Sequence, residues 1–522
     1  MAFESSSPVQ NAFLTSAGFT EDPFSSTNAA DEPRIHQYFI RPPYFTSVVG
    51  DPLQPRSQII LAPRGGGKTA QRIMVERDAD ERQTHVCITY DHFDRHFPGG
   101  RLSTDLNKHL IEISKLVLLY CLIRLEEDNK LASDLSPIER QVIRWQSDNW
   151  LNTFSPSEFQ TALSALSSWK ERAADLFTQY SGQISSFLSA IGQKWGFGAI
   201  NISLMQDKEL RTGSPRFHLG ILIGIIRKLQ YRSVYILIDR IDETNWTSQN
   251  AELSFKLIEP LLTDLQTLET PGIAFKFFLW DQVKDKIVAS GVRRDRIRLF
   301  ELRWKVRDLE NMLQNRLRSF SNNKITSFNE ICEEGIGFNA HRLVCYLGNG
   351  SPRDVIRVCG RIIDEHTRSH AAEKRLSKEV IMRGIRNFCE ERSSELFDTH
   401  VDSIKKLSKL NFTISFVGSD VFRITQQAAR QKIKQWENCG AVEKIDEIEN
   451  PGSRPLFLYG IRDVRLAISC LSREEIEIIL GNFVFPCPEC GQLAISEREE
   501  IICNCGWRHR LAGSRTVWAD VT

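Results

Sequence analysis

The stretch that decides the fold is SQIILAPRGGGKTAQRIMVER, residues 57–77. An apolar run at 57–61 stops at a proline and three glycines, and the sequence from Lys68 has helical character. This succession predicts a strand, a glycine turn and a helix. A second apolar run at 84–90 (THVCITY) follows at the spacing of a βαβ unit, which predicts a parallel sheet.

Three further apolar runs extend this sheet, at 234–238 (VYILI), 273–279 (IAFKFFL) and 297–302. The run at 234–238 is continuous and bounded by charge, which is typical of a central strand buried on both faces. Between the second and third strands the helical patterns are longer than one crossover needs. We therefore predict an α/β fold with a helical insertion at about 101–215.

The glycine turn, APRGGGKT at 62–69, matches the phosphate-loop pattern G-x-x-x-x-G-K-[ST] except that Ala62 replaces the first glycine. Such a loop curls its backbone N–H groups around a phosphate, the lysine reaches the β- and γ-phosphates, and the threonine hydroxyl coordinates Mg²⁺. The alternative is a glycine turn that contains GKT by coincidence. The flanking strand and helix favour ATP binding. The predicted nucleotide-binding residues are Pro63, Arg64, Gly65, Gly66, Gly67, Lys68, Thr69 and Ala70.

Acidic residues follow the central strand directly, in the segment IDRIDE at 238–243. Ligands of open α/β sheets bind at the carboxyl ends of the strands. We predict that Asp239 is the second partner of Mg²⁺, directly or through water, and that Glu243 or Asp242 orients the attacking water. A solvated acidic loop is the alternative interpretation.

These motifs resemble the initiator branch of the AAA+ and STAND P-loop ATPases, which includes origin-recognition proteins, archaeal replication initiators and bacterial relatives. The resemblance rests on 62–69, YILIDRIDE at 235–243 and GSPRDVIR at 350–357, and it covers about 35–395. It implies a P-loop NTPase core with a helical lid, ATP hydrolysis and a homo-oligomer.

Further site residues are implied by the same resemblance. Arg353 occupies the sensor-2 position near the γ-phosphate, and Asp281 occupies the sensor-1 position. Arg294 or Arg293 would be an arginine finger, with Arg294 preferred. Two features depart from the family pattern. Arg240 stands where many AAA+ proteins have glutamate, and the insertion has no counterpart.

After the lid, the segment 426–439 predicts an amphipathic helix with Ala428, Ile433 and Trp436 toward a core. A hairpin around residues 450–453 follows it, and helix then hairpin is the order of a winged helix. We expect this module to contact DNA. A protein-binding winged helix is the alternative, because the hairpin is acidic.

Two cysteine knuckles lie near the C-terminus, with the spacings C-x-x-C and C-x-C. Cys487, Cys490, Cys503 and Cys505 predict a tetrahedral zinc site of the ribbon type. Because the second knuckle is one residue short, His509 is the substitute fourth ligand.

Composition bounds the remaining possibilities. The chain has 522 residues and a net charge of +1, which predicts several domains and excludes a globally basic nucleic-acid coat. With no membrane-spanning run and no secretory signal, we expect a soluble cytoplasmic protein without a membrane partner. The predicted domains are a mobile arm at 1–31 anchored by Phe19 and Phe24, the ATPase core at 32–306, a helical lid at 307–395, the winged helix at 396–480 and the zinc ribbon at 481–522.

The function that these motifs favour together is an ATP-hydrolysing switch or remodelling ATPase that acts with nucleic acid. A role in bacterial anti-phage or mobile-element conflict is suggested by analogy alone. The alternative is a nucleotide-gated scaffold with little turnover, which recruits a separate effector protein through the insertion.

Overall fold

The computed structural model describes residues 12–522 apart from 128–133, 167–169, 181, 195–212, 249, 370–372, 449–455, 490, 498–499, 504–506 and 511–514. The chain forms two compact units. One spans Arg41–Leu302, and the other combines Met1–Ile40 with Arg303–Thr522.

The first unit is built on a five-stranded sheet whose neighbouring strands are all parallel. The strand order is β2-β3-β4-β1-β5, so that the strand before the glycine loop lies between β4 and β5. The strands are β1 (Gln58–Ala62), β2 (His85–Tyr90), β3 (Ser233–Ile238), β4 (Ile273–Trp280) and β5 (Arg298–Glu301). Each lies within two residues of a predicted strand. The predicted α/β class with a parallel sheet is confirmed.

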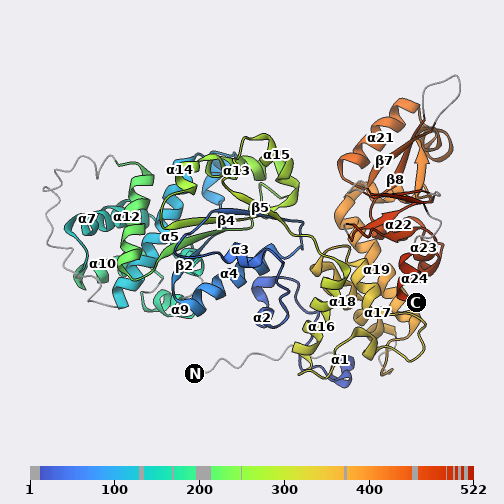
Figure 1. Cartoon of the computed structure of the whole chain (residues 1–522), viewed down its shortest axis with the longest axis horizontal. Coiled ribbons are helices and arrows are strands. Elements are labelled where there is room, and N and C mark those ends of the chain that lie inside the picture. Colours follow the sequence, from blue (N-terminus) through green and yellow to red (C-terminus); the bar gives the residue numbers. More distant parts are fainter. Residues whose placement is uncertain are drawn as a thin grey trace. The chain divides into compact units, whose positions relative to one another are not determined.

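Helices cover both faces of this sheet (Figure 1). Alternate strand residues form one large core with α5 (Leu106–Glu127), α12 (Pro215–Lys228) and α13 (Ala251–Thr263). The opposite face carries α4 (Lys68–Arg82) and, next to it, α3 (Phe45–Val49). Burial on both faces explains why β1, β2 and β3 read as continuous apolar runs.

The insertion between β2 and β3 is narrower than predicted, because α5 and α12 belong to the layer that covers the sheet. The added helices are α7 (Pro137–Gln146), α8 (Pro156–Ser164), α9 (Lys170–Gln179) and α10 (Ile184–Lys194). Just after α8, the Ala165 carbonyl accepts a hydrogen bond of 2.9 Å from the Thr89 N–H. The insertion therefore covers part of the free edge of β2, the outermost strand of the sheet.

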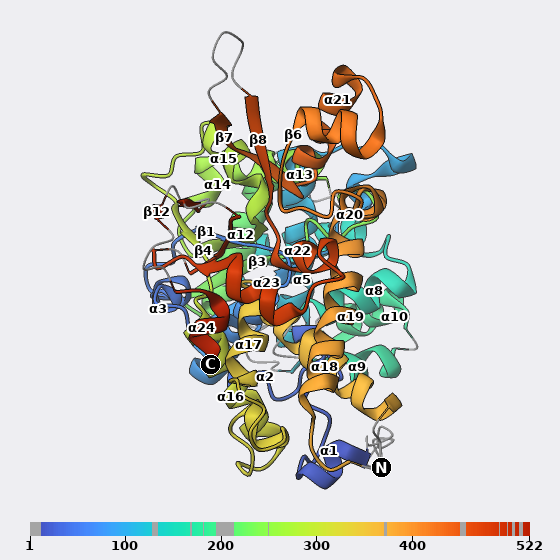
Figure 2. The same cartoon turned by 90° about the vertical axis from the view of Figure 1, so that its right-hand side faces the viewer.

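The second unit is mainly helical (Figure 2). Its first helices are α16 (Val306–Phe320), α17 (Ala340–Leu347), α18 (Pro352–Ser369) and α19 (Lys378–Phe397). The N-terminal segment packs on them, which corrects the expectation of a mobile arm as far as residues 12–31 are concerned. Phe13, Phe19 and Phe24 are buried there. The segment is fixed because the buried Arg316 guanidinium donates to the Pro23 carbonyl and pairs with Glu32 at 2.6 Å.

A three-stranded antiparallel sheet follows in this unit, with the order β6-β8-β7. Its elements are β6 (Asn411–Thr413), α21 (Gln426–Asn438), β7 (Val442–Ile448) and β8 (Leu456–Ile461). The buried residues of α21 are Ala429, Ile433 and Trp436, so Ala429 takes the place predicted for Ala428. The predicted hairpin tip lies outside the described residues.

The C-terminal tail contains two short hairpins, β9 (Val484–Pro486) with β10 (Leu493–Ile495) and β11 (Glu500–Ile502) with β12 (Arg508–Arg510). Cys487 and Cys503, one from each knuckle, are buried in one small cluster with Phe485. Cys490 and Cys505 lie outside the described residues, so the zinc site remains a prediction. Within the described part of the chain, no three histidine, cysteine or acidic side chains are grouped as metal ligands. Nor does that part contain a helix long and apolar enough to span a bilayer.

Lys276, in the middle of β4, is completely buried. Its Nζ donates to the Arg56 carbonyl at 2.9 Å and to Gln58 Oε1 at 3.1 Å, and no carboxylate among the described residues is bonded to it. Burial lowers the pKa of Lys276 to about 7. In the unfolded chain this lysine titrates at about 10.4, so the unfolded state binds more protons between those two values.

We therefore expect Lys276 to make stability rise with pH between about 7 and 10, by up to about 1.4 kcal/mol per pH unit. Lys276→Met should flatten this rise, whereas Met at the exposed Lys256 should not. The measurement is the free energy of unfolding of each protein in denaturant at pH 7 and at pH 9. Equal slopes for wild type and Lys276→Met would contradict the expectation.

Candidate nucleotide site

The loop between β1 and α4 has a backbone that glycine permits. Gly65 and Gly67 have φ of 74° and 93°, in the left-handed region. A Cβ on Gly66 would lie 2.9 Å from the Pro63 carbonyl oxygen, which accepts the Gly66 N–H at 3.0 Å. Ala62, in contrast, is the last residue of β1 and is buried in the sheet. The first glycine of the motif is therefore not needed here.

Lys68 begins α4, and its side chain folds back over the loop. Its Nζ lies 3.4 Å from both the Ala62 and the Pro63 carbonyl oxygens, at the limit of hydrogen bonding. The Thr69 hydroxyl has no hydrogen-bond partner among the described residues. With the positive N-terminus of α4 beside them, these two side chains can bind an anion and its metal ion.

The predicted carboxylates follow β3 and β4, which are neighbours in the sheet, so that both strands end at the same edge. Asp239 and Asp242 are 1% and 2% exposed. Asp239 Oδ2 accepts from Arg72 Nε at 3.1 Å, and its Oδ1 accepts the Arg240 N–H at 2.9 Å. Asp242 Oδ2 accepts from Arg64 Nε at 3.1 Å, whereas its Oδ1 is buried with no partner in the described part of the chain.

Arg64 fixes the phosphate loop to both of these strand ends. Its guanidinium also donates to the Asp242 carbonyl at 2.8 Å and lies 4.4 Å from the ring centroid of Trp280, at the end of β4. The side chain of Arg64 is thus engaged by the protein. The predicted contribution of Arg64 to nucleotide binding would therefore come from its backbone N–H.

Glu243 is the candidate base, and its side chain is 51% exposed. Partial burial and the charges of Asp242 and Asp239 raise the pKa of Glu243. Asp281, at the end of β4, has a pKa raised by burial, although the charge of Lys68 opposes this shift. Asp281 Oδ1 is buried with no partner within the described residues. The structure thus brings Lys68, Asp242, Glu243 and Asp281 into one electrostatic environment.

The sequence reasoning missed Arg72, one helical turn beyond Lys68. Its guanidinium, which is 7% exposed, pairs with Asp239 and with Glu76 of its own helix and donates to Thr89 Oγ1 at 3.0 Å. Burial lowers the pKa of Arg72, but the charges of Glu76 and Asp239 outweigh burial and leave it raised. A helical arginine four residues after the loop lysine was the available signal.

The predicted arginine fingers precede β5, whereas the phosphate loop follows β1. Because the two strands are parallel, these arginines lie at the opposite end of the sheet from the loop. Arg293 is paired with Asp295 at 2.7 Å. The exposed side chain of Arg294 has no such partner among the described residues.

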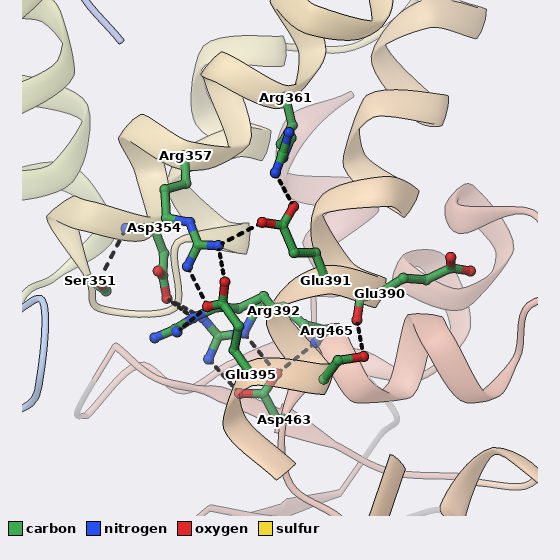
Figure 3. A network of polar contacts seen from close by, with 11 residues as sticks. Ser351, Asp354, Arg357, Arg361, Glu390, Glu391, Arg392, Glu395, Asp463 and Arg465 are labelled. Atoms are coloured by element: carbon green, nitrogen blue, oxygen red, sulfur yellow. Dashed lines mark hydrogen bonds and ion pairs between the residues drawn. The ribbon is translucent and has the colours of Figure 1, made fainter. Parts of the chain in front are cut away.

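Arg353 belongs to the second unit, and its predicted contact with the nucleotide remains a prediction. The next residue, Asp354, is 1% exposed. Asp354 Oδ2 accepts from Arg392 at 3.1 Å and also from Arg465, within the polar network of Figure 3. The start of α18 is therefore fixed to α19 and to α22 (Val464–Cys470).

No protein-family profile and no curated protein matches this chain. Among solved structures, it is similar to Aeropyrum pernix ORC1 in complex with DNA, with 10% identity and a TM-score of 0.39 over 87% of this chain and 96% of that chain. It is similar to ORC2 of that organism in its ADP form, with 11% identity and a TM-score of 0.37 over 87% and 99%. The Thermotoga maritima RuvB Holliday junction branch migration motor gives 10% identity and a TM-score of 0.22 over 44% and 78%. These likenesses assign no activity, so we argue the function from the site.

We expect Lys68→Ala to lose most ATP affinity, because it removes the cation that faces the phosphates while leaving the glycine backbone intact. Isothermal calorimetry of the folded variant with ATP and Mg²⁺ measures this. Lys256→Ala, at an exposed position of α13, is the control and should bind like wild type. Wild-type affinity in Lys68→Ala would remove the phosphate-loop assignment.

Proposed function

We propose that this chain binds ATP with Mg²⁺ at the loop after β1 and hydrolyses it to ADP and phosphate. The observation that carries the proposal is the grouping of Lys68 and the glycine loop with carboxylate oxygens of Asp242 and Asp281 that have no partner among the described residues. Buried carboxylate oxygens without partners are costly, and a metal ion with its water shell would satisfy them. The residues present therefore fit a Mg²⁺–nucleotide complex.

Hydrolysis needs three contributions from the protein. Lys68 and the N-terminus of α4 stabilise negative charge on the phosphates, and Thr69 with a carboxylate of the acidic loop holds the cation. Mg²⁺ supplies further neutralisation of the phosphate oxygens when it is bound. Glu243 takes the proton from the attacking water, and its raised pKa makes it a stronger base than an ordinary glutamate.

A cation from a second copy would complete the site. Within this scheme Arg294 is the arginine finger, since Arg293 is already paired with Asp295. Its place at the far end of the sheet turns it away from its own phosphate loop. We therefore propose a homo-oligomer in which Arg294 reaches the site of a neighbouring subunit, with Arg353 as a sensor in the lid.

The C-terminal module is proposed to bind DNA through α21. Gln427, Arg430, Gln431 and Lys434 are exposed and share one face of the helix, and Glu437 follows at its C-terminal end. Arginine and lysine recognise guanine in the major groove, and glutamine recognises adenine. The strands β7 and β8 after α21 would be the wing of a winged helix. Zinc held by the cysteine knuckles would stabilise the tail.

The second candidate is a nucleotide-gated scaffold with little turnover, which recruits a separate effector protein. Arg240 favours it, because this arginine occupies the place of the usual glutamate and lies 3.6 Å from Glu243. A cation beside the base weakens its proton affinity. The ATPase rate of the purified protein, with and without DNA, separates the two functions.

We expect Glu243→Gln to retain ATP and lose turnover, because the amide keeps the shape but cannot accept a proton. Since the base acts when deprotonated and its pKa is raised, the wild-type rate should fall with acid at a pH above the ordinary pKa of glutamate. Phosphate release measured from pH 5 to 8 tests both statements. Glu252→Gln on α13 serves as the control. Unchanged hydrolysis in Glu243→Gln would exclude Glu243 as the base.

The proposed binding of DNA by the exposed face of α21 can be tested separately. Arg430→Ala with Lys434→Ala should weaken binding of a mixed-sequence DNA duplex by about tenfold or more and lower the salt dependence of the affinity. Fluorescence anisotropy at several salt concentrations measures both quantities. Lys444→Ala on β7, a residue paired with Glu447, is the matched control. Equal affinity and salt dependence in the double variant would exclude this face.

A further inference from the structure

We propose that Asp242, not Asp239, is the carboxylate that holds the magnesium ion of the bound nucleotide, together with Thr69. Asp239 is instead the internal counter-ion of Arg72. This inference rests on the proposed nucleotide site and revises the assignment that the order of residues suggests.

Both oxygens of Asp239 are engaged by the protein. Oδ2 accepts from Arg72 Nε at 3.1 Å, and Oδ1 accepts the Arg240 N–H at 2.9 Å. The Asp239 side chain is 1% exposed and that of Arg72 is 7% exposed, so neither charge is solvated by water. Each therefore depends on the other for compensation.

A dication on Asp239 would have to share that carboxylate with the Arg72 guanidinium. Arg72 stays charged, because a guanidinium is not deprotonated in proteins. Its side chain cannot turn aside freely, since Glu76 and Thr89 also hold the guanidinium. Repulsion between the two cations would thus oppose metal binding at this position.

Asp242 has a carboxylate oxygen without a partner among the described residues, whereas both oxygens of Asp239 are engaged. The carboxylate of Asp242 is 2% exposed, and only Oδ2 is used, by Arg64 Nε at 3.1 Å. Oδ1 is buried and has no hydrogen-bond partner among the described residues, and the same holds for Oδ1 of Asp281. The charges of both Asp242 and Lys68 act on Asp281.

The backbone after β3 explains why the proposed metal ligand is Asp242, three residues after Asp239. Arg240 has φ of 58°, in the left-handed region that non-glycine residues rarely adopt. The chain reverses there, and the Glu243 N–H donates to the Arg240 carbonyl at 3.0 Å. After this turn, Asp242 Oδ2 accepts a hydrogen bond from Arg64 of the phosphate loop. Mg²⁺ is commonly bound by one or two carboxylates, water and phosphate oxygens, which Asp242 and the nucleotide can supply.

The test uses Mn²⁺ in place of Mg²⁺ and a non-hydrolysable ATP analogue with the full chain. Electron paramagnetic resonance measures free Mn²⁺, and calorimetry measures nucleotide binding. Asp242→Asn should weaken Mn²⁺ binding to the nucleotide complex by about tenfold or more. Asp239→Asn should weaken Mn²⁺ binding less than Asp242→Asn does, and it should melt at a lower temperature. Asp285→Asn, at an exposed position of α15 (Lys284–Ala289), is the control.

Two further measurements keep the result clear if Asp239→Asn fails to fold. The double variant Asp239→Asn with Arg72→Gln removes both buried charges together and should bind Mn²⁺ more tightly than Asp242→Asn. In wild-type crystals grown with the analogue and Mn²⁺, the anomalous peak should lie at Asp242. A peak at Asp239, or loss of Mn²⁺ by Asp239→Asn with wild-type binding by Asp242→Asn, would overturn the inference alone. A wild-type chain that binds no nucleotide would overturn the proposed function as well.

Discussion

The buried guanidinium of Arg72 is the contact on which the geometry of the site depends. It joins α4 to the end of β3 through Asp239 and to the end of β2 through Thr89. Removing one partner of such a buried pair costs about 3–5 kcal/mol, which is a large part of the stability of a domain. Because the glycine loop leads directly into α4, this contact also fixes the loop relative to the acidic turn after β3. Arg64 fixes the same two segments from the loop side.

Thr89 connects this arrangement to the insertion. Its hydroxyl contacts Arg72 and Glu76, while its N–H donates to the Ala165 carbonyl just after α8. A cavity of about 340 Å³ lies beside it, between the end of β2, α5 and α8. The helices that have no counterpart in the family pattern are therefore attached to the core at Thr89. The hydroxyl of this residue directly contacts Arg72, the arginine that orders the site. A change in the position of α8 would reach Arg72 through a single side chain.

The parts that could be predicted from sequence share one property: their signal is local. The strands are continuous apolar runs because both faces of the sheet are covered, and the three glycines are required by the backbone of the loop itself. Arg72 was not predicted, because its spacing from Lys68 is a weak signal: its partners at 89 and 239 are distant in the chain, and a helical arginine usually faces water. The packing of the N-terminal segment was not predicted for a related reason. Its few aliphatic residues suggested mobility, but Arg316 binds the carbonyl of Pro23 and the carboxylate of Glu32 across nearly 300 positions. The acidic turn shows an intermediate case, in which the sequence located the carboxylates but the φ of Arg240 decides which oxygen is free.

The start of α18 is held by a buried ion-pair network within the second unit. Arg353 and Asp354 are consecutive, and Asp354 is fixed by Arg392 of α19 and Arg465 of α22. A displacement of this helix end must either carry α22 with it or break a buried ion pair. Breaking the pair costs about 3–5 kcal/mol, more than the roughly 1–3 kcal/mol by which two sites are typically coupled. The less costly movement is that of α18, α19 and α22 together, and α22 follows directly after β8 of the three-stranded sheet. A displacement of the start of α18 would therefore be transmitted to α22 and, through it, toward β8.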